Sequence, residues 1–191
     1  MDKPMEGFEY VCLKGNHEDM MKQAAFGDSQ IWNWWLNNGG NSTVSSYNKK
    51  PFDMMFDKEV WVSTISKHLH WINSLPLTHR DGNYFFVHAG VDPNQPIDGQ
   101  NEQIFLWIRD KFLVSEGPYY MKEDNEDPVK IVHGHTPRFN GYPDIFENSI
   151  NIDTGVFKTK VLTAVALSET DVGESIEIIQ SDRLPHYINL D

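Results

Sequence analysis

Residues 15–18 read Gly-Asn-His-Glu, and they closely follow an apolar, strand-like run, FEYVCL, at residues 8–13. Two later stretches have the same form, Val87-His88-Ala89-Gly90 and His133-Gly134-His135-Thr136. Each stretch puts a nitrogen or oxygen ligand into a glycine turn after a β-prone run. A histidine in such a turn can present one ring nitrogen to a metal while a neighbouring group fixes the other. The three turns therefore predict a metal site on the rim of a β-sheet.

Three side chains in these turns are the candidate ligands: Asn16, His88 and His135. A carbonyl oxygen with two imidazole nitrogens is a mixed set that suits Mn, Fe or Zn better than Ca. Each residue taken alone has a simpler explanation. A Gly-Asn-His turn is usually only a turn, and a strand-end histidine is usually a hydrogen-bonded structural residue. Three such ligands, each at a strand end and each close to a glycine, are much harder to explain by coincidence.

The ordered motifs GNHE, VHAG and HGHT resemble the phosphoprotein-phosphatase branch of the calcineurin-like metallophosphoesterases. Further matching stretches are WLNNGGNSTVSSY at 35–47, LWIR at 106–109, IDTG at 152–155 and LTA at 162–164. They are similar to bacterial and phage members, which include serine/threonine phosphatases and symmetrical bis(nucleosyl)-tetraphosphatases. The resemblance implies an α/β (α+β) fold, in which a calcineurin-like β-sandwich is flanked by helices (αββα). It also implies one metallophosphoesterase domain over residues 1–191.

The resemblance assigns roles to five residues. Asn16, His88 and His135 correspond to the ligands of one metal in a two-metal centre. His17 corresponds to the general acid that protonates the leaving oxygen, and Arg109 to the arginine that holds the phosphoryl group. The expected cofactors are divalent metal ions, Mn first, with Fe or Zn as alternatives. A guanidinium group also suits phosphate for its own physical reason, the bidentate fork, although a helix-surface charge is the simpler explanation for this arginine.

The sequence departs from the family pattern at its beginning. The family starts with Gly-Asp-x-His-Gly and Gly-Asp-x-x-Asp-Arg-Gly turns, which supply the ligands of the other metal, and neither turn occurs here. We expect an N-terminally incomplete chain that lacks the N-terminal βα units, because every later motif is intact. Alternatively, another chain supplies these turns, or the protein is a non-catalytic relative. Such a relative would bind phosphate or a partner through acidic residues 115–127 and the Trp-rich helix end.

Other residues near the motifs have structural explanations. His133 would share a strand face with His135, and we interpret it as a core residue or as a support for the ligands. Asp153 follows a β-run, where its carboxylate could bond backbone N–H groups or support a ligand histidine. The tryptophans near Asn38 could stack on a base or on a substrate ring, but core packing explains them better. The remaining histidines, His68, His70, His79 and His186, lie outside the motifs.

Composition excludes several classes of protein. The net charge of −12 argues against a nucleic-acid partner, because such partners need clustered Lys and Arg, but it does not exclude a phosphorylated protein or a nucleoside polyphosphate as substrate. No apolar run approaches the roughly 20 residues that span a bilayer, so we expect no membrane partner. The single cysteine, Cys12, fits a reducing cytoplasm, and the N-terminus does not resemble a signal peptide. The oligomeric state stays open.

Hydrophobic periodicity predicts alternating helices and strands. The expected helices are 18–36, with a break at Gly27 and a cap at Asp28, then 58–75 and 104–113. The expected strands are 8–13, 84–87, 129–132, 149–153, 161–167 and 174–179. The turn Asn37-Asn38-Gly39-Gly40 should end the first helical region, and residues 115–127 should form a solvated loop or lid.

Overall fold

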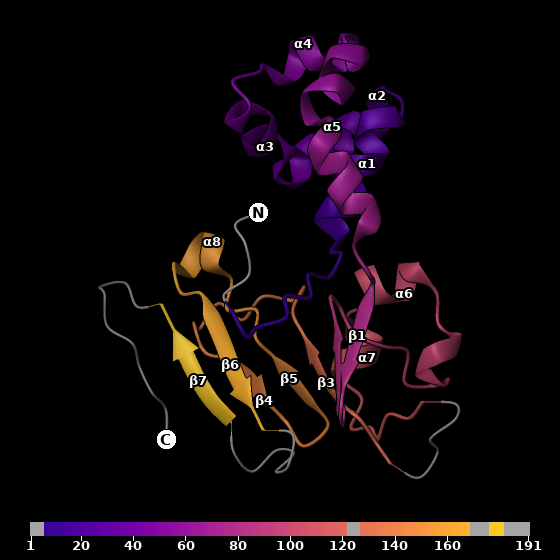
Figure 1. Cartoon of the computed structure of the whole chain (residues 1–191), viewed down its shortest axis with the longest axis vertical. Coiled ribbons are helices and arrows are strands. Elements are labelled where there is room, and N and C mark those ends of the chain that lie inside the picture. Colours follow the sequence, from indigo (N-terminus) through magenta and orange to yellow (C-terminus); the bar gives the residue numbers. More distant parts are fainter. Residues whose placement is uncertain (1–5, 122–126, 169–175, 182–191) are drawn as a thin grey trace. The chain divides into compact units, whose positions relative to one another are not determined.

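The structure is a computed structural model that describes residues 6–121, 127–168 and 176–181 (Figure 1). The chain forms two compact units, a helical unit over Lys14–Pro76 and a sheet unit made of Met1–Leu13 with Leu77–Asp191. We describe each unit by itself. The predicted single domain over residues 1–191 stays a prediction, because two compact units can belong to one functional domain.

Five α-helices build the helical unit. They are α1 (Asn16–Phe26), α2 (Ser29–Trp35), α3 (Asn41–Ser46), α4 (Pro51–Phe56) and α5 (Lys58–Ser74). The predicted break in the first helical region is confirmed. Gly27 ends α1, and the Asp28 carboxylate caps α2 by accepting the N–H groups of Gln30 and Ile31 at 2.8 and 3.0 Å. Helix α5 matches the predicted helix 58–75 within one residue.

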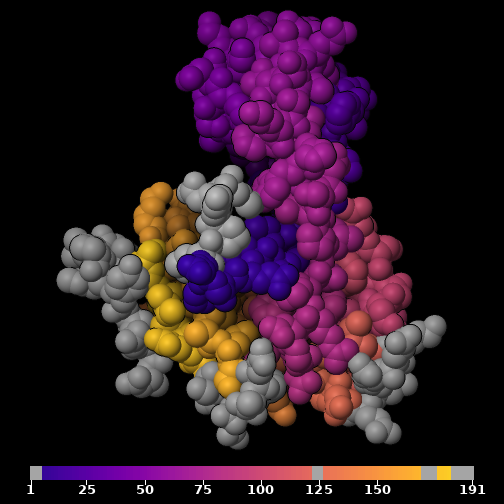
Figure 2. Space-filling model, viewed as in Figure 1, coloured from indigo at the N-terminus to yellow at the C-terminus, as the bar shows by residue number. Residues whose placement is uncertain are grey.

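Three tryptophans form the centre of the helical unit. Trp32, Trp35 and Trp61 are buried, with ring centroids 5.2 to 5.8 Å apart. Such aromatic pairs stabilise a core beyond the area that they bury. The predicted core packing of the helix-end tryptophans is confirmed for two of the three, since Trp34 is 39% exposed. In the space-filling view the described residues of α1 to α5 form a closely packed body (Figure 2).

The turn at residues 37–40 bends the helical chain without ending it, so the predicted stop is wrong. Leu36–Gly40 forms a wide, π-type turn that leads directly into α3. Gly39 takes a φ of +98°, which other residues rarely adopt. Gly40 lies against the ring of Trp35, where a Cβ atom would come within 2.5 Å of Cδ2. The two glycines therefore allow a tight bend around a buried indole.

The sheet unit is built on five strands in the order β1-β2-β3-β5-β4. They are β1 (Thr78–Asp81), β2 (Tyr84–Val87), β3 (Lys130–His133), β4 (Asp144–Ile145) and β5 (Ser149–Asn151). The three central strands β2, β3 and β5 are parallel, and both edge strands are antiparallel to their neighbours. Parallel strands end at the same edge of a sheet, and ligands characteristically bind outside that edge.

Different elements cover the two faces of this sheet. On one face, the helices α6 (Glu102–Trp107) and α7 (Asp110–Leu113) contribute Phe105 and Phe112 to a core with Phe85, Val87 and Ile131. On the other face, the hairpin of β6 (Thr163–Leu167) and β7 (Ile176–Gln180) packs Val165, Leu167 and Ile176 against Tyr84, Val132 and Ile150. The alternation of side chains along β2 produces both cores. The predicted mixed α/β fold with sheets flanked by helices is confirmed.

Three predicted elements differ from the structure. Residues 8–13 are irregular, and none of the described strands pairs with them; Phe8 is 63% exposed, and without a paired neighbour an apolar run does not become a strand. The predicted helix 104–113 is interrupted, because Ile108 is extended between α6 and α7. In the predicted loop 115–127, Tyr119 is buried and bridges Val129, and residues 122–126 lie outside the described residues.

The remaining strand predictions are confirmed within two residues, with residues 174–175 lying outside the described residues. The sequence did not reveal the edge strands β1 and β4 or the short helices α3, α4 and α8 (Val156–Thr159). These elements have two to six residues, too few for a hydrophobic period to show.

Candidate metal and phosphate site

The candidate site lies at the carboxyl edge of the parallel strands. His88 directly follows β2, and His135 follows β3 after one glycine. The two turns are held together by a hydrogen bond in which the Gly134 N–H donates to the His88 carbonyl at 2.9 Å. The parallel pairing of β2 with β3 therefore brings together two turns that lie 47 residues apart in the sequence.

The two histidine rings face each other directly. His88 Nε2 lies 3.1 Å from His135 Nδ1, with the ring centroids 4.9 Å apart in an edge-to-face arrangement. His135 is only 8% exposed, has a φ of +65°, and carries the Trp107 ring against it at 5.9 Å. A left-handed backbone is rare for a histidine, and such positions cluster at functional sites.

This pair fits two ligands of one metal ion. Imidazole nitrogens bind zinc-like metals at about 2.0–2.1 Å, so two ligand nitrogens 3.1 Å apart correspond to an angle of about 95–102° at the metal. In the described parts of the chain, no group of three or more His, Cys, Asp and Glu side chains is placed to hold a metal. The geometry of the sheet unit is therefore compatible with two imidazole ligands, His88 and His135.

Arg109 reaches the same turns. Its Nη1 donates to the Oγ1 atom of Thr136 at 3.1 Å, one residue beyond His135. The extended backbone at Ile108 separates Arg109 from α6, and Arg109 itself precedes α7. The structure therefore brings together three of the five predicted site residues. Asn16 and His17 lie at the start of α1 in the helical unit, so their relation to the histidine pair stays a prediction.

The comparison with known families agrees with this geometry. A family model, calcineurin-like phosphoesterase, matches residues 2–161. The chain belongs to this family. Its members are hydrolases that cleave phosphoesters with divalent metal ions, which fits a histidine pair beside an arginine at the end of parallel strands. No curated protein sequence matches the chain. None of the helices among the described residues is long and apolar enough to cross a membrane.

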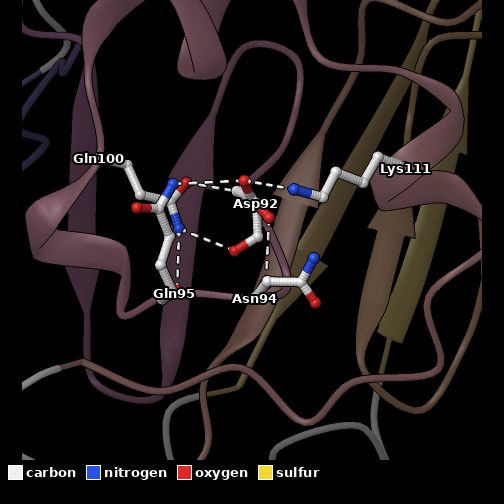
Figure 3. Close-up of polar contacts among 5 residues, drawn as sticks. All are labelled: Asp92, Asn94, Gln95, Gln100 and Lys111. Carbon is white, nitrogen blue, oxygen red and sulfur yellow. Dashed lines mark hydrogen bonds and ion pairs between the residues drawn. The ribbon is translucent and has the colours of Figure 1, made fainter.

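In this calcineurin-like phosphoesterase, a polar network braces the loop that follows His88 (Figure 3). The backbone of Asp92 is clamped by Gln100, whose Oε1 accepts the Asp92 N–H at 2.7 Å and whose Nε2 donates to the Asp92 carbonyl at 2.9 Å. The Asp92 carboxylate accepts a bond from Lys111 Nζ at 2.6 Å. This bond, followed by the Asn94 N–H, lowers the pKa of Asp92 below its ordinary value.

Sequence reasoning missed this brace. The only local signal is the Asp-Pro-Asn order at residues 92–94, which is typical of a turn in which the aspartate accepts a later N–H. Nothing local pairs Asp92 with Lys111, because 19 residues separate them. Lys111 lies on α7, two residues after Arg109, so the brace connects the His88 loop to the helix that begins beside the arginine.

His133 and Asp153 are structural. The His133 ring is 4% exposed and lies 4.8 Å from the Phe112 ring, and burial lowers its pKa to about 4. His133 is therefore a neutral core residue near pH 7, as one of the two interpretations predicted. The Asp153 carboxylate accepts the Gly155 N–H at 3.0 Å and so shapes the turn after β5. This bond confirms the predicted contact with backbone N–H groups.

His17 occupies an exposed position on α1. The Glu18 carboxylate accepts the Gly15 N–H at 2.9 Å, so the motif fixes the start of its own helix. His17 also lines a cavity of about 320 Å³ within the helical unit. A histidine with access to such a cavity can exchange a proton with a group that is bound there.

Proposed function

We propose that this phosphoesterase hydrolyses phosphate esters of proteins or nucleoside polyphosphates at the carboxyl edge of its five-stranded sheet. The observation that carries the proposal is the 3.1 Å separation of His88 Nε2 and His135 Nδ1, with Arg109 bonded to the next residue, Thr136. Two imidazoles for a metal and a guanidinium for a phosphoryl oxygen are the elements that such a reaction needs.

Each of the five residues then has a role. His88 and His135 hold a divalent metal, manganese by our expectation, with Asn16 as a third ligand because of its place in the GNHE motif. A bound divalent metal supplies Lewis acidity and a lowered pKa for water. Arg109 holds and orients the phosphoryl oxygens through the guanidinium N–H groups that are not bonded to Thr136. His17 donates a proton to the leaving oxygen. The single cysteine supports the cytoplasm as the place of this activity.

A second candidate function is phosphate or partner binding without turnover. It is favoured by one observation: among the described residues, no group of three or more His, Cys, Asp and Glu side chains is placed to hold a metal. We prefer hydrolysis because the histidine pair and the arginine are both in place.

A manganese titration of the full chain, measured by calorimetry, tests the metal site. We expect one weak site that is lost in both His88→Ala and His135→Ala. Two tight sites together with full turnover of an aryl phosphate would contradict the expected single weak site, and no manganese binding at all would contradict the metal role of the pair.

Turnover separates the two candidate functions. Hydrolysis predicts release of phosphate that depends on manganese and falls in Arg109→Lys, because lysine lacks the bidentate fork. His17→Asn should lower turnover far more for alkyl than for aryl phosphates, since a poor leaving group needs the proton more. Equal losses for both ester types would remove the general-acid role, and phosphate binding without turnover would favour the binding module.

A further inference from the structure

The helical unit contains a cavity that His17 lines and that the other four proposed hydrolytic residues do not line. It has a volume of about 320 Å³, within the usual range for small-molecule sites. Helices α1 and α5, the wide turn and the α3 region enclose it, and all of its lining residues belong to the helical unit. Besides His17, the residues that matter here are Trp35, Asn38, Thr43, Tyr47, His68 and Trp71.

Two tryptophans contribute to the walls of the cavity. Trp71 on α5 is half-buried and lines it, and Trp35 is held in place by the buried tryptophan cluster. Gly39 and Gly40 also line it and carry no side chain. A cavity with tryptophans in its walls can accommodate a planar ring, because rings gain free energy by stacking on aromatic side chains.

Polar groups are fixed at the edge of this aromatic space. Asn38 Nδ2 donates to the Trp34 carbonyl at 2.8 Å, which orients the amide while using only one of its two N–H groups. The Tyr47 hydroxyl hydrogen-bonds His68 Nδ1, and burial raises the pKa of the Tyr47 phenol, so the hydroxyl stays protonated near pH 7. An asparagine amide offers one acceptor beside one donor, which matches the N6–H and N7 edge of adenine.

We propose that this cavity binds the purine base of an adenine nucleotide, with the ring against Trp71 and its N6/N7 edge at Asn38. His17 lines the same cavity, so the bound group would be the nucleotide that leaves when the phosphate ester is cleaved. The role of His17 toward that leaving group rests on the proposed function, whereas binding of the base does not. A phenyl ring, as in a phosphotyrosine, has no donor or acceptor for the amide and is the competing occupant.

Binding of adenosine to the full chain tests the proposal without a phosphate and, in EDTA, without a metal. We expect calorimetry to show one site, with an affinity about tenfold weaker in Trp71→Leu because a stacking partner is lost. Trp34→Leu is the matched control, since Trp34 is an exposed tryptophan outside the cavity, and it should bind as the unchanged protein does.

Inosine tests the Asn38 contact. It has an oxygen in place of the N6 amino group, so it should bind several-fold more weakly than adenosine, and Asn38→Ala should abolish this difference. Asn38 is exposed, so this variant remains informative if Trp71→Leu does not fold.

Three results would overturn the proposal. They are no adenosine binding by the folded protein, equal binding of adenosine and phenol, and an inosine difference that persists in Asn38→Ala. His88→Ala separates this proposal from the hydrolytic one, because it should lose manganese and keep adenosine. Adenosine binding without hydrolysis would contradict only the proposed function, and hydrolysis without adenosine binding would contradict only this inference.

Discussion

Lys111 Nζ lies 2.6 Å from the Asp92 carboxylate and so joins the loop after His88 to the helix that begins beside Arg109. Gln100 clamps the backbone of Asp92 from the other side. The aspartate side chain is 15% exposed and the lysine side chain 50% exposed, so solvent screens the pair and its contribution to stability is small. We therefore infer that the ion pair positions Arg109 and contributes little to the free energy of unfolding.

Asp92→Asn should weaken the affinity for inorganic phosphate by about threefold, within the range of a partly exposed ion pair, and leave the unfolding midpoint nearly unchanged. The reason is that α7 loses its charged tie while the bonds to the Asp92 backbone remain. Phosphate titrations in the presence of manganese measure the effect.

Exchanging the two charges is the control for this prediction. The double variant Asp92→Lys with Lys111→Asp should recover most of the phosphate affinity, because the same two positions again attract each other. If the double variant binds phosphate as weakly as Asp92→Lys alone, the ion pair does not position the arginine. The combination of Arg109→Ala with Asp92→Asn should bind phosphate no more weakly than Arg109→Ala alone.

The two histidines of the HGH sequence should separate in a metal-binding assay. His135→Ala should lose manganese, because His135 Nδ1 faces His88 Nε2, whereas His133→Leu should retain it, because that ring lies against Phe112. Calorimetric titration of both variants at pH 7.5 checks this. Loss of manganese in both variants, with unchanged circular dichroism, would show that His133 takes part in the site.

His133 also predicts a pH dependence of stability. Its pKa is lowered to about 4 in the folded protein by burial, against an ordinary value of about 6.5, so below pH 6.5 the unfolded chain binds the proton more readily. The contribution of neutral His133 to stability is then fully present above pH 6.5. It is lost as the pH falls from 6.5 to about 4, by at most about 3 kcal/mol.

Urea unfolding between pH 7 and pH 4 measures this loss. His133→Leu should flatten the curve, and His70→Leu, a change of an exposed histidine on α5, should leave it as it is. An unchanged slope in His133→Leu would assign the pH dependence to other groups.

Much of the fold follows from local sequence, and the failures among the strands share one cause. Helix α5 and the Asp28 cap depend on neighbouring residues, and periodicity and capping chemistry reveal them. The run 8–13 has the composition of a strand, yet a strand depends on a paired neighbour that may lie anywhere in the chain. All four residues of the edge strand β1 are polar, so its pairing with β2 had no hydrophobic signal.

The site shows the same division. The glycine turns that carry His88 and His135 were visible because each follows its own strand, and parallel pairing explains why they meet. The partner of Arg109 and the Asp92–Lys111 pair depend on tertiary contacts across 27 and 19 residues, which no local pattern encodes. The proposed role of Asn38 and Trp71 rests on a cavity that the helices form, which no local pattern encodes.

The Gly39-Gly40 pair makes a last prediction about the helical unit. A Cβ atom at Gly40 would come within 2.5 Å of the Trp35 ring, and Trp35 is buried among other tryptophans and has no room to move. Gly40→Ala should therefore destabilise the protein by about 1–3 kcal/mol, the usual result of overpacking. Gly39→Ala meets no atom within 4 Å but has a φ of +98°, so it should lose only about 1 kcal/mol through backbone strain.

Urea unfolding followed by tryptophan fluorescence measures both variants, because the overpacked ring is itself a reporter. Gly99→Ala is the matched control, since an added Cβ there meets open space at an ordinary φ, and it should be nearly neutral. Equal losses in Gly39→Ala and Gly40→Ala would mean that the bend, and not the contact with Trp35, sets the requirement for glycine. In that case adenosine binding should fall equally in both variants, because both glycines line the cavity of the helical unit.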